Sequence, residues 1–334
     1  MADLIAGKLG TVVVLGSVHT DLIAAADKLP GPGQSVTGTS FATAPGGKAA
    51  NQACQLARCG ADVALIGKVG TDQPGVELRA KLEAAGVCTR FLAVDAEAPT
   101  GTSTVLTAAG EYTSIIVPGA SARLTTSEVD AAFASIADPV ALVLQLELPL
   151  DIVTYTAERA AGRGMTVVLN ASPVPDDPAS IPSELWEATE ILVANREEAN
   201  ALLISAMESP DAVVMAQALA GAYGVETVAI TLGSGGAAMY SAERFLEQLA
   251  YPAQVIDTIG AGDAFLGTLV AGMVVRLPIE LALRRAVAAG ALAVGGRGAL
   301  ESIPNAAQIE ELVQRHSESQ GHNNSLGSSQ ERHR

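Results

Sequence analysis

The residues best suited to chemistry lie in one short stretch, Asp257 to Asp263, with the sequence Asp-Thr-Ile-Gly-Ala-Gly-Asp. An apolar, helix-patterned run, Ala264 to Val270, follows directly. Small residues at the start of a helix leave several backbone N–H groups unpaired, and such amides form a site for an anion. Because a carboxylate would repel a bound phosphate, Asp263 is better explained as a base that takes a proton from a hydroxyl, while the amides stabilise the group in transfer. In the simpler alternative, Asp263 only caps the helix.

A second polar stretch, Pro45 to Ala53, opens another expected helix, which runs to about Cys59 and stops at Gly60. Its Gly-Gly-Lys suggests a phosphate-binding loop, but the spacing of a P-loop is absent, because alanine stands at positions 42 and 49. Lys48 and Asn51 are three residues apart and are therefore neighbours on the helix. Their ammonium and amide groups could both contact hydroxyls of a polar ligand.

The elements that must position these residues begin with a short buried strand, Val12 to Leu15, and His19 and Asp21 are expected in the loop after it. Parallel strands bring the residues at their carboxyl ends to one edge of a sheet, where α/β proteins bind ligands. Taken singly, Glu147 could be an exposed loop acid and Asn195 with Glu198 a helix cap. Further strands, alternating with helices, are expected at 140–144, 166–169, 191–194 and 227–231, and they lead to Glu147, Asn170, Asn195 with Glu198, and Gly233.

Two segments do not follow this alternation of strands and helices. Residues 22–44 suggest strands that stand apart from the main sheet, and residues 100–118 suggest a hairpin that turns at 108–111. Together they predict a small β-sheet that covers the strand edge as a lid. The last expected helix covers residues 279–294, and residues 317–334 have the composition of a disordered tail.

Composition and charge exclude several classes of protein. The chain has 334 residues, enough for one large α/β domain with a small appendage. Its 20 basic and 36 acidic residues give a net charge of −16, which argues against binding to nucleic acid or to an anionic membrane. No apolar run has the length of a signal-peptide core or of a membrane span, so the protein is expected in the cytoplasm. The three cysteines form no zinc or disulfide pattern and are expected to be reduced.

Two motifs together resemble a known family. The chain has G-G-K-x-x-N-Q-A at 46–53 and D-T-x-G-A-G-D at 257–263. Both look like the signatures of the ribokinase-like (phosphofructokinase-B type) family of carbohydrate kinases, and the resemblance covers residues 11–312. It implies a three-layer, Rossmann-like α/β domain on a parallel sheet, with a small β-sheet lid that also pairs two subunits in a homodimer. The implied reaction is ATP-dependent phosphorylation of the primary hydroxyl of a pentose, in particular of D-ribose to D-ribose 5-phosphate.

The resemblance also implies a role for each matching position. Asp263 would be the base, with the amides of Gly260, Ala261 and Gly262 as the anion hole. The positions that match sugar-binding residues are His19, Asp21, Gly46, Gly47, Lys48, Asn51, Glu147 and Asp263. Those that match the nucleotide site are Asn195 and Glu198, which would organise Mg²⁺ and phosphates through water, and Thr231, Gly233 and Val287. An activating K⁺ would be held, largely through backbone carbonyls, by Asp257, Ile259, Ala293, Gly296, Gly298 and Ser302.

Two positions depart from the family pattern. His19 stands in the implied sugar pocket where the family has asparagine, and Ala49 stands where glycine is common. The first departure leaves the sugar open, and another pentose, a ketohexose or a nucleoside are the alternatives. A nucleoside would need stacking partners for its base, and the lid segments offer only Phe41 and Tyr112. A binding protein without catalysis would be expected to have lost Asp263 or a glycine of the anion hole, and this chain has kept them.

Overall fold

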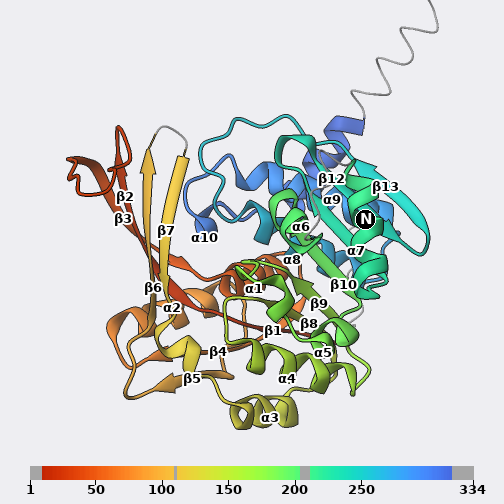
Figure 1. Cartoon of the computed structure of the whole chain (residues 1–334), viewed down its shortest axis with the longest axis horizontal. Coiled ribbons are helices and arrows are strands. Elements are labelled where there is room, and N and C mark those ends of the chain that lie inside the picture. Colours follow the sequence, from red (N-terminus) through yellow and green to blue (C-terminus); the bar gives the residue numbers. More distant parts are fainter. Residues whose placement is uncertain (1–9, 109–110, 204–210, 318–334) are drawn as a thin grey trace, which may run out of the picture.

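A large, mostly parallel β-sheet forms the centre of the fold (Figure 1). The computed structural model describes residues 10–108, 111–203 and 211–317, so the tail expected at 317–334 lies outside the described residues except for its first position. Among the described strands of this large sheet, the antiparallel pairs are those that β12 (Ala237–Ser241) forms with β11 (Thr227–Thr231) and with the edge strand β13 (Arg244–Gln248). The strands lie in the order β13 (Arg244–Gln248), β12 (Ala237–Ser241), β11 (Thr227–Thr231), β10 (Ile191–Asn195), β9 (Thr166–Asn170), β8 (Pro139–Gln145), β1 (Thr11–Leu15), β4 (Asp62–Gly70) and β5 (Leu92–Asp95).

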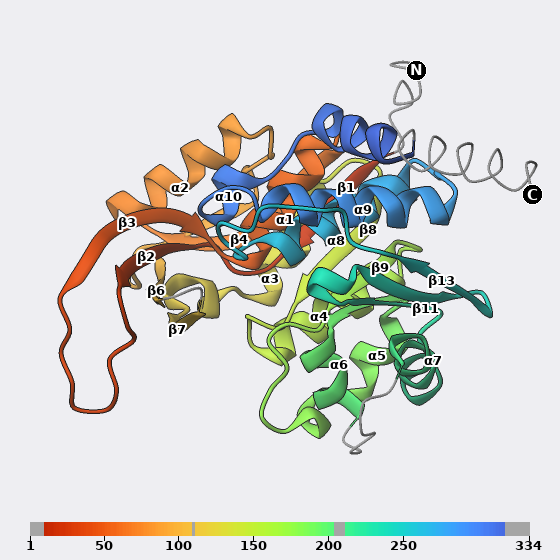
Figure 2. The same cartoon turned by 90° about the horizontal axis from the view of Figure 1, so that it is seen from above.

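Helices cover both faces of this sheet, and Figure 2 shows them in two layers. Successive residues of a strand point to opposite faces, so Val12 and Val14 pack in one apolar cluster while Val13 and Leu15 pack in the other. This confirms the expected three-layer α/β architecture. None of the described helices is both long and apolar enough to span a membrane. One layer contains α1 (Lys48–Arg58), α2 (Gln73–Ala84), α8 (Ala261–Val274) and α9 (Ile279–Ala293); the other contains α3 (Thr126–Ser135), α4 (Leu150–Ala161), α5 (Ser183–Ala188), α6 (Arg196–Leu203) and α7 (Ala212–Tyr223).

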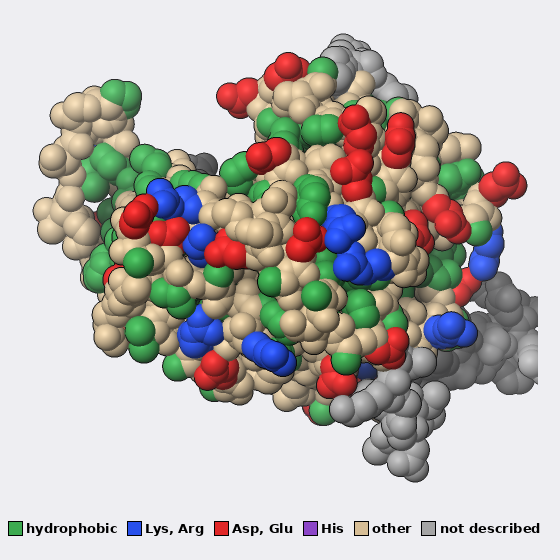
Figure 3. Space-filling model, turned by 90° about the horizontal axis from the view of Figure 1, so that it is seen from below, with side chains coloured by type: hydrophobic (Ala, Val, Ile, Leu, Met, Phe, Trp, Pro, Cys, Tyr) green, Lys and Arg blue, Asp and Glu red, His purple; other side chains and the backbone are tan. Residues whose placement is uncertain are grey.

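A smaller sheet stands apart from the main one and is built from the two segments that break the alternation. In it, β2 pairs antiparallel with β3 and parallel with β6. Figure 3 shows that the small sheet projects from the body, with an open notch beside its tip. Its strands, in spatial order, are β3 (Gly38–Gly46), β2 (His19–Ala26), β6 (Gly101–Ala108) and β7 (Glu111–Val117).

The structure corrects the expectation at three places. His19 and Asp21 belong to strand β2 and not to a loop, because the chain passes directly from the main sheet into the small one. Strands β12 and β13 form an antiparallel hairpin that a regular alternation of strands and helices does not predict. The helix expected at 279–294 is not the last one, since α10 (Ala299–Ser302) and a helical segment at 306–317 follow it and pack against the same core.

Asp72 ties the small sheet to the main domain. Its carboxylate caps α2 by accepting a hydrogen bond from the amide of Gly75 at 3.2 Å. It also accepts hydrogen bonds from the backbone amide of Thr100, at 2.9 Å, and from the Thr100 hydroxyl. Burial favours the neutral acid, but these hydrogen bonds outweigh burial and lower the pKa of Asp72 below its usual 3.8. One side chain therefore holds both a helix start and the residue that precedes β6.

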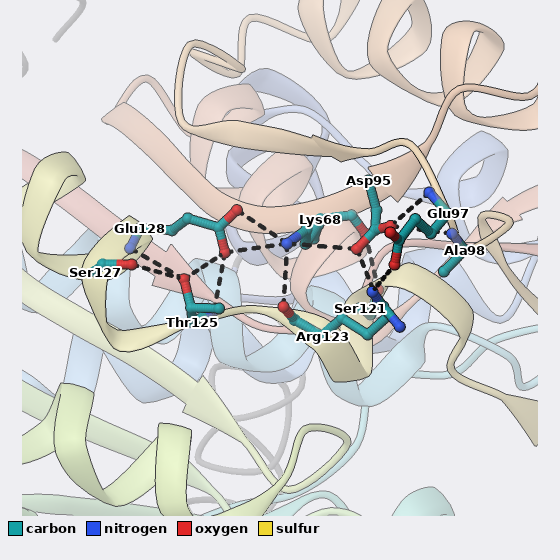
Figure 4. A network of polar contacts seen from close by, with 9 residues as sticks. All are labelled: Lys68, Asp95, Glu97, Ala98, Ser121, Arg123, Thr125, Ser127 and Glu128. Carbon is teal, nitrogen blue, oxygen red and sulfur yellow. Dashed lines mark hydrogen bonds and ion pairs between the residues drawn. The ribbon is translucent and has the colours of Figure 1, made fainter.

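A buried ammonium group fixes the other end of the segment that contains β6 and β7 (Figure 4). Lys68 of β4 lies 3.0 Å from Glu128 Oε1 and 3.5 Å from Asp95 Oδ2 and donates to the carbonyl oxygen of Arg123 at 3.1 Å. Arg123 ends the short helix η2 (Gly119–Arg123), which follows β7, and its Nε donates to Asp95 Oδ2 at 2.9 Å. A buried charge is tolerated only when it is paired, and here the pairing joins β4, β5, α3 and the exit of the small sheet.

We expect Asp72→Ala to lower the free energy of unfolding by about 2–4 kcal/mol, since it removes a helix cap and the hydrogen bonds to Thr100. Denaturant unfolding measures this loss. The matched control is Asp211→Ala, because Asp211 caps α7 through the amide of Val213, away from the small sheet, and should lose clearly less. The stability difference between wild type and Asp72→Asn should be full above pH 3.8 and shrink as pH falls below it, because the carboxylate of the unfolded chain is protonated first and the native one only at its lowered pKa. Equal losses of unfolding free energy in Asp72→Ala and Asp211→Ala would contradict the role of Asp72 in joining the small sheet to the main domain.

Candidate active site

Polar side chains from several parallel strands meet at one edge of the main sheet, as the sequence predicts. Gln145 ends β8 in register with Asn170, which ends β9. Asn195 ends β10 in register with Thr231, which ends β11. Helix α1 also begins at this edge, since Gln52 Nε2 donates to Asn170 Oδ1 at 3.1 Å. The carboxyl edge of the sheet is therefore where the candidate site is assembled.

Helix α8 begins here with the glycine-rich turn. Gly260 is its N-cap and has a φ of 80°, which favours glycine. A Cβ at Gly260 would also lie 2.9 Å from the Cα of Ala299, so a side chain does not fit there. A Cβ at Gly262 would meet nothing within 4 Å, so the space in front of this turn is open. Amides in a first turn have no helical acceptor, but that of Ala261 donates to the carbonyl oxygen of Thr258 at 3.3 Å and is the least available of the predicted anion hole.

Asp263 lies in the first turn of α8 and is only 8% exposed. Its Oδ1 accepts a hydrogen bond from Gln52 Nε2 at 2.8 Å, and its Oδ2 accepts one from Asn51 Nδ2 at 2.9 Å. Since the N-cap is Gly260 and the turn has no side-chain cap, the explanation of Asp263 as a mere cap is wrong.

The surroundings of Asp263 favour its protonated form. Burial raises the pKa of this carboxyl above its usual 3.8. The positive charge of Lys48 and the hydrogen bonds from Asn51 and Gln52 oppose the rise in pKa, whereas the negative charge of Glu147 adds to it. A carboxylate with a raised pKa is a better proton acceptor, and perturbed acids of this kind are typical of active sites.

The start of α1 lies close against the beginning of the small sheet. Gly47 is the N-cap of α1 with a φ of 97°, and a Cβ there would clash with the carbonyl oxygen of Ser17. A Cβ at Gly46 would lie 2.5 Å from the carboxylate of Asp21. Both glycines are therefore required by close contacts, and they bring Asp21 next to the helix that carries Lys48 and Asn51.

Glu147 faces the same place from the main sheet. Its Oε2 accepts a hydrogen bond from the backbone amide of Lys48 at 3.1 Å and another from the hydroxyl of Ser17. Glu147 is thus bound to the N-terminal end of α1, where a negative charge is stabilised by the helix. The explanation of Glu147 as an exposed loop acid is wrong, because its side chain holds two segments together.

Two buried acceptor atoms at this place have no hydrogen-bond partner among the described residues. His19 Nε2 lies 3.2 Å from Asp21 Oδ1, and because a carboxylate only accepts, Nε2 carries the hydrogen and Nδ1 is an acceptor. His19 Nδ1 and Asn51 Oδ1 are both buried and unpaired within the described ranges. Buried polar atoms are normally satisfied, so these two acceptors are suited to the hydroxyl groups of a ligand.

The residues predicted for a nucleotide lie farther along the sheet edge. The amide of Asn195 donates to Glu198 Oε2 and the amide of Glu198 donates to Asn195 Oδ1, both at 2.8 Å. This is the reciprocal helix cap that the sequence leaves as an alternative, and it uses one oxygen of Glu198. Gly233 has open space at its Cβ position, Thr231 ends β11 beside it, and the side chain of Val287 packs in the apolar core.

The residues predicted for K⁺ lie in two segments, 257–259 and 293–302, that meet beside the predicted anion hole. Asp257 accepts hydrogen bonds from the amides of Ile259 and Gly298, both at 3.0 Å, and the Ser302 hydroxyl donates to the Gly298 carbonyl at 2.6 Å. The oxygen atoms that could coordinate an ion here belong to a carboxylate and to backbone carbonyls, and such oxygen ligands suit a hard cation. These loops bring together Asp257, Ile259, Ala293, Gly296, Gly298 and Ser302.

Divalent metal ions have no protein cage in the described ranges, where no group of three or more His, Cys, Asp or Glu side chains is arranged to hold one. A Mg²⁺ bound with few protein ligands keeps waters and takes substrate phosphates instead. The Oε1 atom of Glu198 takes no part in the pair with Asn195 and suits contact with such a hydrated ion.

The sequence predicts Asn170 at this edge of the sheet but assigns no role in the site to Ser17, Gln52, Gln145 or Asn170, and the structure places all four in contact with site residues or with one another. Gln52 contacts Asp263 directly, and Gln145 donates to Gln52 Oε1 at 2.6 Å. The available signals were the position of Gln52 next to Asn51 and the positions of Gln145 and Asn170 at strand ends. Their contacts depend on strand register and on the packing of α1, which no single segment specifies.

Comparison with known proteins places the chain in a family. Residues 10–306 match the model of the pfkB family carbohydrate kinases. The ribokinase of Haemophilus influenzae is 32% identical over 305 residues, which cover 91% of this chain and 98% of that protein. The ribokinase of Bacillus subtilis is 32% identical over 302 residues, with 90% and 99% covered. The structure of Arabidopsis thaliana ribokinase complexed with ribose and ATP is similar with a TM-score of 0.81 at 30% identity, covering 91% of this chain and 98% of that one.

The match extends over nearly all of the folded chain, and both sequence motifs fall inside it. The main parallel sheet, the two helical layers and the small second sheet agree with the ribokinase structure. This chain belongs to the pfkB family of carbohydrate kinases, enzymes that transfer a phosphoryl group to an alcohol group.

Proposed function

We propose that this protein is an ATP-dependent kinase that phosphorylates the primary hydroxyl of D-ribose to give D-ribose 5-phosphate. The observation that carries the proposal is the buried carboxylate of Asp263 beside the open first turn of α8. It sets a proton acceptor next to amide donors, as phosphoryl transfer to a hydroxyl requires. The similarity to two ribokinases, and to a third that is complexed with ribose and ATP, supports ribose and ATP as the substrates.

In the proposed reaction, Asp263 accepts the proton of the sugar hydroxyl as the hydroxyl oxygen attacks the γ-phosphorus of ATP. The amides of Gly260, Ala261 and Gly262 stabilise the negative charge on the phosphoryl oxygens while the bond to ADP breaks. Such catalysis consists mainly of positioning and electrostatic stabilisation. The proton then leaves Asp263 for solvent, which restores the base.

The sugar is held at the start of α1 and at the base of the small sheet. Asn51 Oδ1 and His19 Nδ1 accept hydrogen bonds from its hydroxyls, and both atoms are buried and unpaired in the described part of the chain. Asp21, Lys48 and Glu147 supply charged partners around the ring. Gly46 and Gly47 add their backbone to the sugar site, and their lack of side chains lets Asp21 and the Ser17 carbonyl pack against the start of α1.

The nucleotide lies along the sheet edge next to the sugar in this proposal. Thr231 and Gly233 contact it, and the segment of α9 around Val287 lies on the far side of its pocket. Asn195 and Glu198 would hold a Mg²⁺ through its water shell, and the ion would supply positive charge against the phosphates. Two features support this: the open space at Gly233 and the position of the Asn195–Glu198 pair at the end of β10.

The small sheet acts as a lid over the sugar and pairs two subunits in a cytoplasmic homodimer, in our proposal. Several of its apolar side chains are exposed, including Phe41, at 67%, and Ile115, at 71%. Exposed apolar groups of this kind on one small sheet favour an interface with another chain. Another sugar remains the main alternative because of His19. A nucleoside has less support, because the sequences of the two lid segments contain only two aromatic residues, Phe41 and Tyr112, to stack on a base.

The substrate assignment is tested by ADP release with a panel of pentoses, ketohexoses and nucleosides, for wild type and His19→Asn. We expect wild type to have its highest kcat/KM with D-ribose. His19→Asn replaces the acceptor Nδ1 with the amide oxygen of a shorter side chain, so KM for the sugar should change about fivefold to tenfold, as for one hydrogen bond gained or lost, with kcat nearly unchanged. A higher kcat/KM with another sugar would overturn ribose, and an unchanged KM would remove His19 from sugar recognition.

The role of the base is tested by Asp263→Asn. We expect kcat to fall by roughly 10²-fold to 10⁴-fold, because the hydroxyl proton then has no acceptor, while sugar and ATP still bind. In wild type, kcat should fall as pH drops through the raised pKa of Asp263, and thus at a higher pH than an ordinary aspartate with a pKa of 3.8 would give. Asp177→Asn, at a surface cap, is the control. More than about a tenth of wild-type kcat in Asp263→Asn would contradict the assignment.

The proposed K⁺ site is tested by replacing Na⁺ with K⁺ at constant ionic strength. We expect both the rate and the midpoint of thermal unfolding to rise in K⁺, because the ion orders the loops that adjoin the anion hole. Asp257→Asn removes the only carboxylate among the six predicted positions and should abolish both differences. Equal rates and equal midpoints in the two salts would count against the site.

A further inference from the structure

The buried amide of Gln52 has no role in the reaction as proposed above, yet it contacts the base directly. Gln52 follows Asn51 on α1 and is 0% exposed. Its Nε2 lies 2.8 Å from Asp263 Oδ1 and 3.1 Å from Asn170 Oδ1, and its Oε1 accepts a hydrogen bond from Gln145 Nε2 at 2.6 Å. Both ends of this amide are therefore bonded, inside the protein and away from solvent.

The backbone of β10 determines the direction of these hydrogen bonds. The carbonyl oxygen of Val193 can only accept, and Asn170 turns its Nδ2 to it at 3.1 Å. Asn170 Oδ1 then faces Gln52, which must offer its Nε2. Because the same Nε2 faces Asp263, the oxygen of Gln52 is left for Gln145. An amide flip at Gln52 would break hydrogen bonds to three neighbours at once.

Gln145 is fixed in its turn by the end of β1. It is buried at the end of β8, in register with Asn170. Its Oε1 occupies the space that a Cβ at Gly16 would take, so the absence of a side chain at Gly16 is what admits it. The chain of contacts through Gln145 and Asn170 to Gln52 is therefore bonded to backbone at the Val193 carbonyl, while at Gly16 Gln145 is held by close packing, its Oε1 having no hydrogen-bond partner among the described residues.

We infer that Gln52 is a positioning residue that holds Oδ1 of Asp263 toward the protein interior and leaves Oδ2 as the atom that takes the proton from the sugar hydroxyl. Oδ2 is bonded by Asn51, whose own Oδ1 is unpaired in the described part of the chain and faces the ligand in the proposed function. The hydroxyl then approaches between Asn51 and Oδ2. The inference rests on the proposed function in one respect, that Asp263 is the base.

A hydrogen bond donated to a carboxylate favours its charged form, so loss of Gln52 should raise the pKa of Asp263 further. The charged groups that act on Asp263 are Lys48, on the same helix as Gln52, and Glu147, from the loop after β8. Neither is changed in the variants below. A shift in the titration of Asp263 therefore reports on the amide contact itself.

The test compares Gln52→Met with Gln55→Met. Both residues are fully buried glutamines of α1, but Gln55 Nε2 donates to the carbonyl oxygen of Pro304 at 3.1 Å, away from Asp263. Two readouts are taken: the kcat and KM of each variant against pH, and the ¹³C NMR titration of the Asp263 carboxyl, assigned by its absence in Asp263→Asn. The NMR titration needs no turnover, so it separates failure of this inference from failure of the proposed function.

For Gln52→Met we expect kcat at neutral pH to fall roughly tenfold to a hundredfold, as when a supporting hydrogen bond behind an active group is lost. KM for sugar and ATP should stay within about twofold, because binding contacts remain. The acid limb of kcat and the carboxyl titration should both move to higher pH. Gln55→Met should lose stability and leave both pH profiles unchanged.

Gln145→Met provides a second route if Gln52→Met does not fold. It leaves Gln52 Oε1 without its donor, so it should move the Asp263 titration in the same direction by a smaller amount. In the double variant, the two effects should be less than additive, because they act through one contact. An Asp263 titration that is unchanged in Gln145→Met, or in a folded Gln52→Met, would overturn the inference, as would an equal shift in Gln55→Met.

Discussion

The buried carboxylate at the start of α8 is the constraint on which the rest of the structure depends. A charge removed from water is unfavourable unless other groups bond it, and Asp263 finds its bonding groups on a different helix, α1. The two helices must therefore lie in direct contact. Gly267 of α8 makes this possible, since a Cβ there would lie 2.7 Å from the Cβ of Gln55. The start of α1 is in turn pressed on Ser17 through Gly47, so β1, α1 and α8 form one unit around the carboxylate.

The second feature of the proposed site is that its partners for an anion are mainly backbone amides and to a lesser extent cationic side chains. The chain carries a net charge of −16, yet its family transfers a phosphoryl group. At physiological salt, charges on the far surface are screened beyond about 8 Å. The fixed N–H dipoles of the first turn of α8 act at contact distance and are not weakened in this way. A strongly acidic protein can therefore hold a phosphate without a basic patch.

Much of the fold follows from local sequence patterns. Val12 to Leu15 has the β-branched composition of a buried strand and forms one. The glycine-rich turn at 260–262 begins a helix, and Gly260 can take the left-handed conformation that this turn requires. The sequence does not predict the contacts among Gln52, Gln145 and Asn170, because they arise from strand register and from the packing of α1 on the sheet. The hairpin of β12 and β13 is missed for a similar reason, since its pairing partner is an edge formed by β11.

The small sheet has its root at the proposed sugar pocket. In the strand register, His19 of β2 is paired with Gly46 of β3 on one side and with Gly101 of β6 on the other. These three strands leave the body together at this point. A Cβ at Gly101 would lie 3.0 Å from the Cβ of His19, so the strands are closely packed at this point. Any tilt of the small sheet relative to the body must displace the residues of the proposed sugar pocket. The measured affinity for the sugar is then the intrinsic affinity multiplied by the fraction of molecules whose sheet is correctly placed, so a substitution far out on the sheet can weaken binding without touching the ligand.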